Sequence, residues 1–406
     1  MSMTYKEFLA SLGIAVFPDA GETVYAAACA RADGTGSVYV REDYLDALDA
    51  ELGLFPFHRD TVYRAAAAIR ENAALSRFTV LLAETLRADA AGVQRCRDWT
   101  LPAVPEGEDP LPYEMTGFFA ELALVREAAA VLRAHAVPED VVRRTMAQLD
   151  WSITIFAGTR HRPGYDASRV RWTLHYLKPD ILHIDRLEFE MKPFSGAVYG
   201  FRNAAGDVRL LMADGRLHHS GQLLGSAGCL DDGWPGTPWQ AFDADFRETE
   251  DVYEGCPVEN GAASRVREKL EKSEWTRFLA PGDPVLSVHI PAGERLSHED
   301  VCASYRRARE IFAAYGYSYR AVVCTSWLMS PVLGELLGEE TNIVRFQRDY
   351  RLFPIPSGGR GVYTFLYNMP DARPEELPAD TTLRRRVRER LLGGGYVLEG
   401  GGVLTI

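Results

Sequence analysis

The stretch from Val285 to Leu328 constrains the fold of this chain more than any other. Two short apolar runs rich in valine, Val285 to Ile290 and Ala321 to Trp327, flank a segment whose apolar residues recur at helical spacing. Those residues are Val301, Tyr305, Ala308, Ile311, Phe312 and Tyr315. The pattern predicts a strand, a helix and a second strand, which together form one βαβ unit.

A turn suited to an anion separates the first strand from the helix. Pro291, Ala292 and Gly293 predict a turn whose backbone N–H groups can approach a ligand. Ser297, with Asp300 three residues later, forms a variant of the capping box that begins a helix. A strand that ends in such a turn at a helix N-terminus favours anion binding. Most strand-turn-helix units bind nothing and only pack, so the local pattern leaves both interpretations open.

Length and charge limit the kinds of protein this chain can be. At 406 residues it exceeds what one hydrophobic core usually serves, so we expect two domains. Its 45 basic and 57 acidic residues give a formal charge of −12, and the acidic residues are spread along the chain. Such a field repels nucleic acid and anionic membranes, so we expect neither as a partner.

The cysteines and the apolar runs indicate where the protein works. The six cysteines fall at no metal-like or redox spacing, and no stretch reaches the apolar length of a membrane span. The N-terminal residues contain no apolar segment of the kind that directs secretion. We therefore expect a cytoplasmic protein with reduced thiols.

The period of the apolar residues changes along the chain. Residues 1–150 are helical in pattern and predict an all-α domain, with amphipathic stripes such as the one through Leu45, Leu48 and Leu52. A second domain is expected over residues 151–406, beginning with an antiparallel meander. The predicted strands are Ser152 to Ala157, Val170 to Leu177, Ile181 to Met191, Ala197 to Phe201 and Val208 to Met212.

The remaining segments are less regular. Residues 215–282 are rich in glycine and proline, which predicts an insertion or lid with its own helix around Ser264 to Phe278. After the βαβ unit we expect further elements in the same domain. They are a short helix from Pro331 to Leu337, strands from Asn342 to Gln347 and near Val362 to Leu366, a basic helix from Leu383 to Leu392, and glycine-rich terminal strands.

Several short motifs connect these segments to a known family. They are His289-Ile290-Pro291-x-Gly293, Ala303-Ser304, the run Cys324 to Leu328, Thr341-Asn342-Ile343-x-x-Phe346 and the run Arg186 to Glu190. Together they resemble bacterial acyltransferase-domain proteins that join an N-acyltransferase-type N-terminal domain to a GNAT-like C-terminal domain. The resemblance implies an α+β protein, in which an all-α domain precedes a GNAT-like mixed α/β domain with a central twisted sheet.

The resemblance also implies a reaction and a cofactor site. The expected reaction moves an acyl group from acyl-CoA or acetyl-CoA to the amine of a small molecule, with no metal. The residues expected to hold the cofactor are Pro291, Ala292, Gly293, Arg295 and Ser297. GNAT enzymes usually carry a Q/R-x-x-G-x-G/A signature at this turn, and the turn after Ile290 lacks it. A formal match, Gln222 to Ala227, precedes no helical pattern, and we interpret it as chance.

Two residues are the expected proton acceptors. His289 ends the first strand of the βαβ unit, and a histidine can remove a proton from an amine near neutral pH. Glu188 and Glu190 alternate with apolar residues on a predicted strand, so both point to one face. We expect Glu188 or His289 to act as the base. The alternative function is a catalytically inactive GNAT-like protein that binds a metabolite or regulates, and the missing signature favours it.

Other polar groups have simpler explanations in the sequence. The basic loop from Thr159 to Gly164 could hold a phosphate or be an exposed turn. His298 and Cys302 stand one helical turn apart, which permits a metal but is explained more simply by a solvated cap and a buried thiol. Cys324 and Ser326 share a strand face, where we expect packing. The pair His218-His219, with Cys229, Asp231 and Asp232, fits no recognised zinc spacing.

Overall fold

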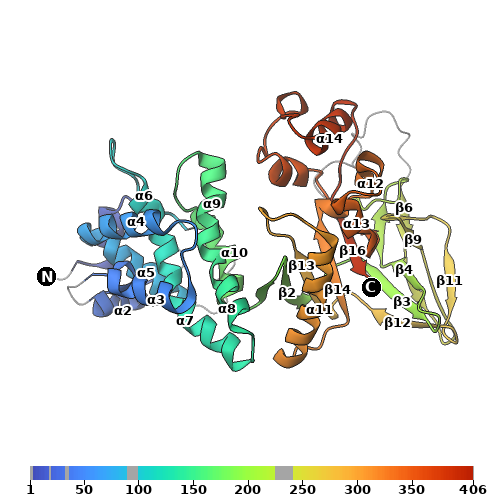
Figure 1. Cartoon of the computed structure of the whole chain (residues 1–406), viewed down its shortest axis with the longest axis horizontal. Helices are drawn as coiled ribbons and strands as arrows, with labels where there is room; N and C mark the ends of the chain where they lie inside the picture. Colours follow the sequence, from blue (N-terminus) through green and yellow to red (C-terminus); the bar gives the residue numbers. More distant parts are fainter. Residues whose placement is uncertain (1–2, 18–19, 33–35, 89–98, 225–240, 406) are drawn as a thin grey trace. The chain divides into compact units, whose positions relative to one another are not determined.

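Two compact units make up the protein. The computed structural model describes residues 3–17, 20–32, 36–88, 99–224 and 241–405 (Figure 1). One unit comprises Met1–His183 and the other Ile184–Ile406. None of the described helices has the length and hydropathy that crossing a membrane requires.

The first unit is helical. Among the described residues before Ile181, every regular element is a helix. They are α1 (Tyr5–Ser11), α2 (Glu22–Ala32), η1 (Val38–Val40), α3 (Glu42–Leu52), α4 (Arg59–Glu71), α5 (Ala73–Ala88), α6 (Leu111–Glu114), α7 (Thr116–Ala134), α8 (Glu139–Met146), α9 (Gln148–Arg160), η4 (Ala167–Arg169) and α10 (Val170–Leu177). The predicted stripe through Leu45, Leu48 and Leu52 is confirmed, since all three side chains of α3 are buried.

Two strands predicted for the start of the meander are helices instead. The run Ser152 to Ala157 lies inside α9, and Val170 to Leu177 is α10. Val170, Leu174 and Leu177 recur at helical spacing and are buried, so packing against helices overrides the strand preference of their β-branched and aromatic neighbours. The change of domain expected after residue 150 falls inside α9, whereas the two compact units divide between His183 and Ile184.

A six-stranded mixed sheet has five of its strands in the second unit, and its first strand spans the division at His183. Its order is β1-β2-β13-β14-β16-β15. The strands are β1 (Ile181–Ile184), β2 (Leu187–Pro193), β13 (Pro284–His289), β14 (Ala321–Ser326), β16 (Gly400–Leu404) and β15 (Tyr350–Pro354). The predicted βαβ unit is confirmed, because β13 and β14 pair in parallel and α11 (His298–Tyr315) connects them. The antiparallel neighbours β2 and β16 flank this central pair.

The two faces of β2 differ in character. Phe189 points toward α11, where its ring contacts those of Tyr305 and Phe312, and α11 packs over β2 (Figure 1). Side chains alternate along a strand, so Glu188 and Glu190 point to the opposite face. Strand β2 thus buries an apolar face under α11 and carries Glu188 and Glu190 on the other, where neighbouring strands of the sheet also supply buried apolar residues such as Val285 and Val323.

The rest of the second unit consists of small sheets and short helices. The smaller sheets have the orders β12-β3-β4, β11-β8-β7, β5-β6 and β10-β9. Their strands are β3 (Val198–Asn203), β4 (Val208–Met212), β5 (Gly215–Leu217), β6 (Phe242–Ala244), β7 (Arg247–Glu248), β8 (Val252–Gly255), β9 (Val258–Glu259), β10 (Ala262–Ala263), β11 (Glu268–Glu271) and β12 (Trp275–Leu279). The helical elements are η5 (Trp327–Met329), α12 (Val332–Leu337), α13 (Asn342–Arg348), η6 (Val362–Leu366), η7 (Pro374–Glu376) and α14 (Thr382–Leu392).

Three predictions for these segments are wrong. The helix expected over Ser264 to Phe278 is replaced by β11 and β12, in which buried Leu270 stands between charged neighbours with the period of a strand. The strand expected over Asn342 to Gln347 is α13, and the one near Val362 is a single π-helical turn. Short apolar runs fit both periods, so their neighbours in the fold decide. Part of the expected insertion, residues 225–240, lies outside the described residues, and its role as a lid stays a prediction.

Candidate active site

Glu188 and His289 are direct neighbours across two strands. In the antiparallel pair of β2 and β13, His289 stands opposite Glu188, and Ser287 stands opposite Glu190. Residues directly opposed in such a pair project to the same face of the sheet. The two residues expected as bases therefore share one face, and Glu190 shares it with them.

Glu190 holds the His289 ring. Its Oε2 atom lies 2.9 Å from Nε2 of His289 and 2.6 Å from Nζ of Lys192. Burial alone would raise the pKa of Glu190, but hydrogen bonds from His289 and Lys192 outweigh it and lower that pKa to about 2. Glu190 is therefore a carboxylate throughout the neutral range, and it fixes the imidazole at the end of β13.

Exposure distinguishes the three groups. Glu188 and Glu190 are only 4% and 9% exposed, whereas the side chain of His289 is 24% exposed. A reactant can reach the imidazole more readily than either carboxylate. The arrangement is that of an accessible proton acceptor backed by a buried carboxylate.

The sheet opens beside His289. The ladder between β13 and β14 ends at the pair Val288 and Cys324, one residue before His289. Strand β14 nevertheless continues to pair with β16 as far as Ser326. The two central parallel strands therefore stop pairing at the level of His289, which leaves this residue at the point where they separate.

The turn expected to hold the cofactor follows directly. Gly293 has φ of 103°, a conformation that favours glycine, and Ala292, Gly293 and Arg295 are exposed while Pro291 and Ser297 are partly buried. The buried side chain of Arg186, in the turn between β1 and β2, donates hydrogen bonds of 2.8 Å and 3.2 Å to the carbonyls of Glu294 and Arg295. No local sequence pattern predicts this anchor, because it joins segments more than 100 residues apart.

The N-terminus of α11 is already capped. Ser297 Oγ accepts a hydrogen bond of 3.2 Å from the N–H of Asp300, and Glu299 and Asp300 place two carboxylates in the first turn. These acids already complement the positive end of the helix dipole. An anion bound at this turn would therefore depend on Arg295 and on the backbone N–H groups of residues 292–296 more than on the helix itself.

Two family models match the chain. The model described as GNAT-like C-terminal domain matches residues 181–404, and the one described as N-acyltransferase N-terminal domain matches residues 43–178. The first alone covers more than half of the 406 residues. The chain belongs to the GNAT-like C-terminal domain family. The family resemblance inferred from the short motifs is confirmed.

Solved structures with the same fold cover nearly the whole chain. An acyltransferase mutant in complex with octanoyl-CoA is 18% identical, with a TM-score of 0.57, and the match covers 98% of each chain. An acyltransferase in complex with decanoyl-CoA and teicoplanin is 19% identical, with a TM-score of 0.57 and 99% of each chain covered. An acyltransferase in complex with CoA and 10C-teicoplanin is 19% identical over 100% of each chain, with a TM-score of 0.57. No curated protein matches the chain.

Within the GNAT-like domain, Cys324 is a packing residue, as expected. Its side chain is fully buried, and burial raises the pKa of the thiol to about 12. The thiol points to the face opposite His289, because the two residues occupy alternate positions in the paired strands β13 and β14. A nucleophilic role for Cys324 would need a nearby base and a lowered thiol pKa, and the thiol pKa is raised instead. The pair of His289 and Glu190 is therefore the candidate for chemistry in this domain.

The other polar candidates do not extend this site. In the helical unit, Arg162 donates hydrogen bonds to both carboxylate oxygens of Glu114 at 2.5 Å and 2.6 Å, so the charge of Arg162 is already balanced. The rings of His218 and His219 lie with their centroids 3.9 Å apart and are tilted by 44° to each other. Cys229, Asp231 and Asp232, and residues 225–227 of the formal signature match, lie outside the described residues.

Proposed function

We propose that this protein is an acyltransferase that moves an acyl group from an acyl-CoA thioester to the amine of a small molecule. The observation that carries the proposal is the pair formed by His289 and Glu190 where β13 and β14 stop pairing. Family membership supports it, and so do solved structures of the same fold that contain octanoyl-CoA, decanoyl-CoA or CoA.

His289 is the proposed proton acceptor. An amine is protonated in water near neutral pH, so it must lose a proton before its nitrogen can attack a carbonyl carbon. The partly exposed imidazole can take that proton directly or through one water, while ionised Glu190 holds the ring and stabilises its positive charge. Glu188, directly opposite on β2, is the alternative acceptor. As the new C–N bond forms, the thioester C–S bond breaks and the thiolate leaves and takes up a proton.

The turn after β13 is the proposed site for the phosphates of coenzyme A. Pro291, Ala292, Gly293, Arg295 and Ser297 lie between the strand that ends in His289 and the start of α11. Arg186 fixes the backbone of this turn, so its N–H groups are held in place before a ligand arrives. Binding here would bring the thioester to the opening beside His289, where backbone N–H groups could polarise its carbonyl.

The acceptor is proposed to be a small-molecule amine. Two similar structures contain teicoplanin or 10C-teicoplanin together with a CoA species, which supports a small-molecule acceptor for this chain. The net charge of −12 attracts cationic amines and repels nucleic acid. A cytoplasmic location, which the spacing of the six cysteines favours, is part of the same proposal.

The second candidate function is a GNAT-like module that binds a metabolite without turnover. It is favoured by the missing Q/R-x-x-G-x-G/A signature and by the acidic residues Glu294, Glu299 and Asp300 around the turn. Carboxylates beside a phosphate weaken its binding, so coenzyme A itself would be a poor ligand under this alternative. A module of this kind would bind a ligand without releasing a thiol.

An acyl-transfer assay distinguishes the two functions. Purified protein is mixed with decanoyl-CoA and a panel of primary amines, including glycopeptide and amino-sugar amines, and free thiol is measured over time. We expect thiol release that requires both an amine and the protein, with a product heavier by one acyl group. Thiol release no faster than in protein-free solution for every amine, in a protein that still binds the thioester or another metabolite, would assign the binding function instead.

A further inference from the structure

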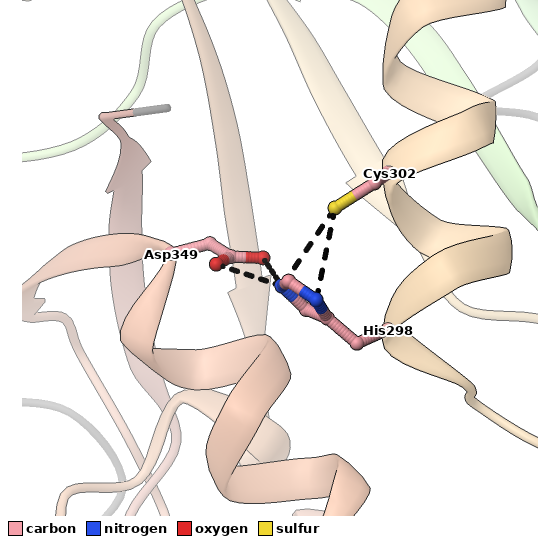
Figure 2. Close-up of side chains that lie close together, drawn as sticks. All are labelled: His298, Cys302 and Asp349. Carbon is pink, nitrogen blue, oxygen red and sulfur yellow. Dashed lines mark hydrogen bonds and ion pairs between the residues drawn. The ribbon is translucent and has the colours of Figure 1, made fainter.

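Three side chains with metal-binding atoms meet in the second unit, away from the sheet face that carries His289. His298 begins α11, Cys302 lies one turn later on the same helix, and Asp349 follows α13 just before β15. Figure 2 shows the three side chains pointing toward one another from the two sides of this contact. Their nearest candidate ligand atoms all lie within 4.8 Å of one another.

The distances converge on one nitrogen. Nε2 of His298 lies 3.1 Å from each carboxylate oxygen of Asp349 and 3.7 Å from Sγ of Cys302 (Figure 2). The other ring nitrogen, Nδ1, is 3.9 Å from the sulfur. A catalytic thiol-imidazole-carboxylate relay needs its thiol and its carboxylate on different ring nitrogens. Here both approach Nε2 more closely, so the arrangement is not a relay.

A metal ion binds a histidine through one ring nitrogen, so its other ligand atoms must lie near that same nitrogen. Zinc binds nitrogen, oxygen and sulfur at roughly 2.0 to 2.3 Å in a tetrahedron, which separates its ligand atoms by roughly 3.2 to 3.8 Å. The separations of 3.1 Å and 3.7 Å lie at or close to that range. An ion placed between Nε2, Sγ and a carboxylate oxygen would replace the direct contacts among them. The third separation, between Sγ of Cys302 and a carboxylate oxygen of Asp349, is within 4.8 Å, and rotation of these side chains about their bonds would bring it into the range.

We propose that His298, Cys302 and Asp349 bind one divalent transition metal ion, of which zinc is the chemically preferred one. An imidazole, a thiolate and a carboxylate together suit zinc better than magnesium or calcium, which prefer oxygen ligands alone. Three protein ligands leave a fourth position for water or a ligand. Solvent reaches the group from the side of His298, whose side chain is 41% exposed, while that of Asp349 is 10% exposed.

Metal binding at these three side chains would be coupled to pH. Burial, and then the carboxylate of Asp349, raise the pKa of the Cys302 thiol, and nearby Arg306 lowers it only partly. Burial likewise raises the pKa of Asp349. The phenols of Tyr305 and Tyr350 face the same groups and are hydrogen-bonded to each other at 2.7 Å. A divalent cation must displace the thiol proton, so binding should release protons and strengthen as pH rises.

The sequence alone suggested only two of the three ligands, and we expected no metal. His298 and Cys302 have the i, i+4 spacing that places two side chains on one helix face. Asp349 lies 47 residues after Cys302 in the sequence. The fold brings it there through α13 and the start of β15, which is a tertiary arrangement that no local pattern reports.

Cobalt provides the direct test. The purified protein, treated with a chelator and kept reduced with a phosphine, is titrated with Co²⁺ and then with Zn²⁺. We expect a near-ultraviolet thiolate-to-cobalt absorption that saturates at one ion per chain and disappears when zinc displaces cobalt. Cys302→Ser should abolish this absorption. His298→Asn and Asp349→Asn should each weaken binding by at least about tenfold, the lower end of what even a supporting residue costs.

Matched variants in the helical unit serve as controls. Cys29→Ser removes another partly buried thiol, and His175→Asn removes a histidine that lies 3.4 Å from a carboxylate oxygen of Asp180. Both should bind cobalt as the wild type does. Zinc should also slow alkylation of Cys302 by iodoacetamide, read by peptide mass, and leave alkylation of Cys29 unchanged. Absence of a thiolate band in the wild type, a band that survives Cys302→Ser, or unchanged alkylation of Cys302 would each overturn the proposal.

Discussion

His289 depends on a carboxylate from the neighbouring strand for its position. Glu190 is nearly buried, carries a negative charge throughout the neutral range and is bonded to both His289 and Lys192. An imidazole held in this way keeps one orientation and gains a partner for the positive charge it acquires with a proton. These features favour His289 over Glu188 as the base.

Replacing the base tests this preference. We expect His289→Asn to lower kcat by about a hundredfold or more while leaving coenzyme A affinity nearly unchanged. Glu188→Gln should have a smaller effect, because Glu188 is the less exposed of the two. Acyl-transfer kinetics and coenzyme A titrations of both variants provide the measurement, with His175→Asn as a control histidine paired to a carboxylate. Full activity in His289→Asn and Glu188→Gln would remove both residues from the mechanism.

At the scale of elements, the turn between β13 and α11 is held in place by a side chain from another segment of the chain. Arg186 bonds two of its carbonyls, and Gly293 takes a positive φ. The sequence predicted the strand, the turn and the capped helix here, because each has a local signature. It could not predict the Arg186 anchor or the pairing of Glu190 with His289, because both depend on which strands become neighbours.

Gly293→Ala tests the turn. An alanine with φ of 103° is strained by about 1 to 2 kcal/mol, and relief of that strain would move the backbone that faces the ligand. We expect a higher Kd for coenzyme A, by about tenfold for each 1.4 kcal/mol lost. Gly282→Ala is the matched control, since Gly282 has φ of 89° in the turn before β13. Equal coenzyme A affinity in the two variants, measured by calorimetry, would separate the turn from the ligand.

A buried carboxylate makes the stability of the helical unit depend on pH. Glu121 on α7 is fully buried and accepts a hydrogen bond of 2.8 Å from Tyr165, with Thr173 as a further donor. Burial raises the pKa of Glu121 from 4.5 to about 8, although these hydrogen bonds oppose the shift. Between those two values the folded state binds more protons than the unfolded state, so stability falls as pH rises through that window.

Glu121→Gln should remove this dependence. The amide has nearly the same shape and cannot ionise, so we expect the variant to gain stability relative to wild type as pH rises from about 5 to about 8. Each pKa unit of difference corresponds to about 1.4 kcal/mol. Thermal unfolding across this range gives the comparison, with Glu139→Gln as an exposed control paired to Arg133. Parallel melting curves for Glu121→Gln and wild type at every pH would contradict the assignment.

At the scale of the whole molecule, the sequence predicted the fold class and the family better than it predicted individual elements. The βαβ unit was recognisable because its strands are rich in valine and its helix has a cap at Ser297. The strands expected at Ser152 and Val170 are helices, because short runs with β-branched and aromatic residues fit both periods until packing selects one. The division of the chain near His183 therefore lies later than the first strand-like run suggested.

Hydrogen exchange with and without coenzyme A tests the central claim most directly, because it shows whether the ligand binds and where. The protein is incubated in deuterated buffer with and without saturating coenzyme A or decanoyl-CoA, and peptides are read by mass. We predict slower exchange in the segment from the end of β13 through Ser297. This segment includes the Glu294 and Arg295 backbone that Arg186 anchors. Unchanged exchange in this segment with saturating ligand, or protection confined to residues of the helical unit, would contradict the account.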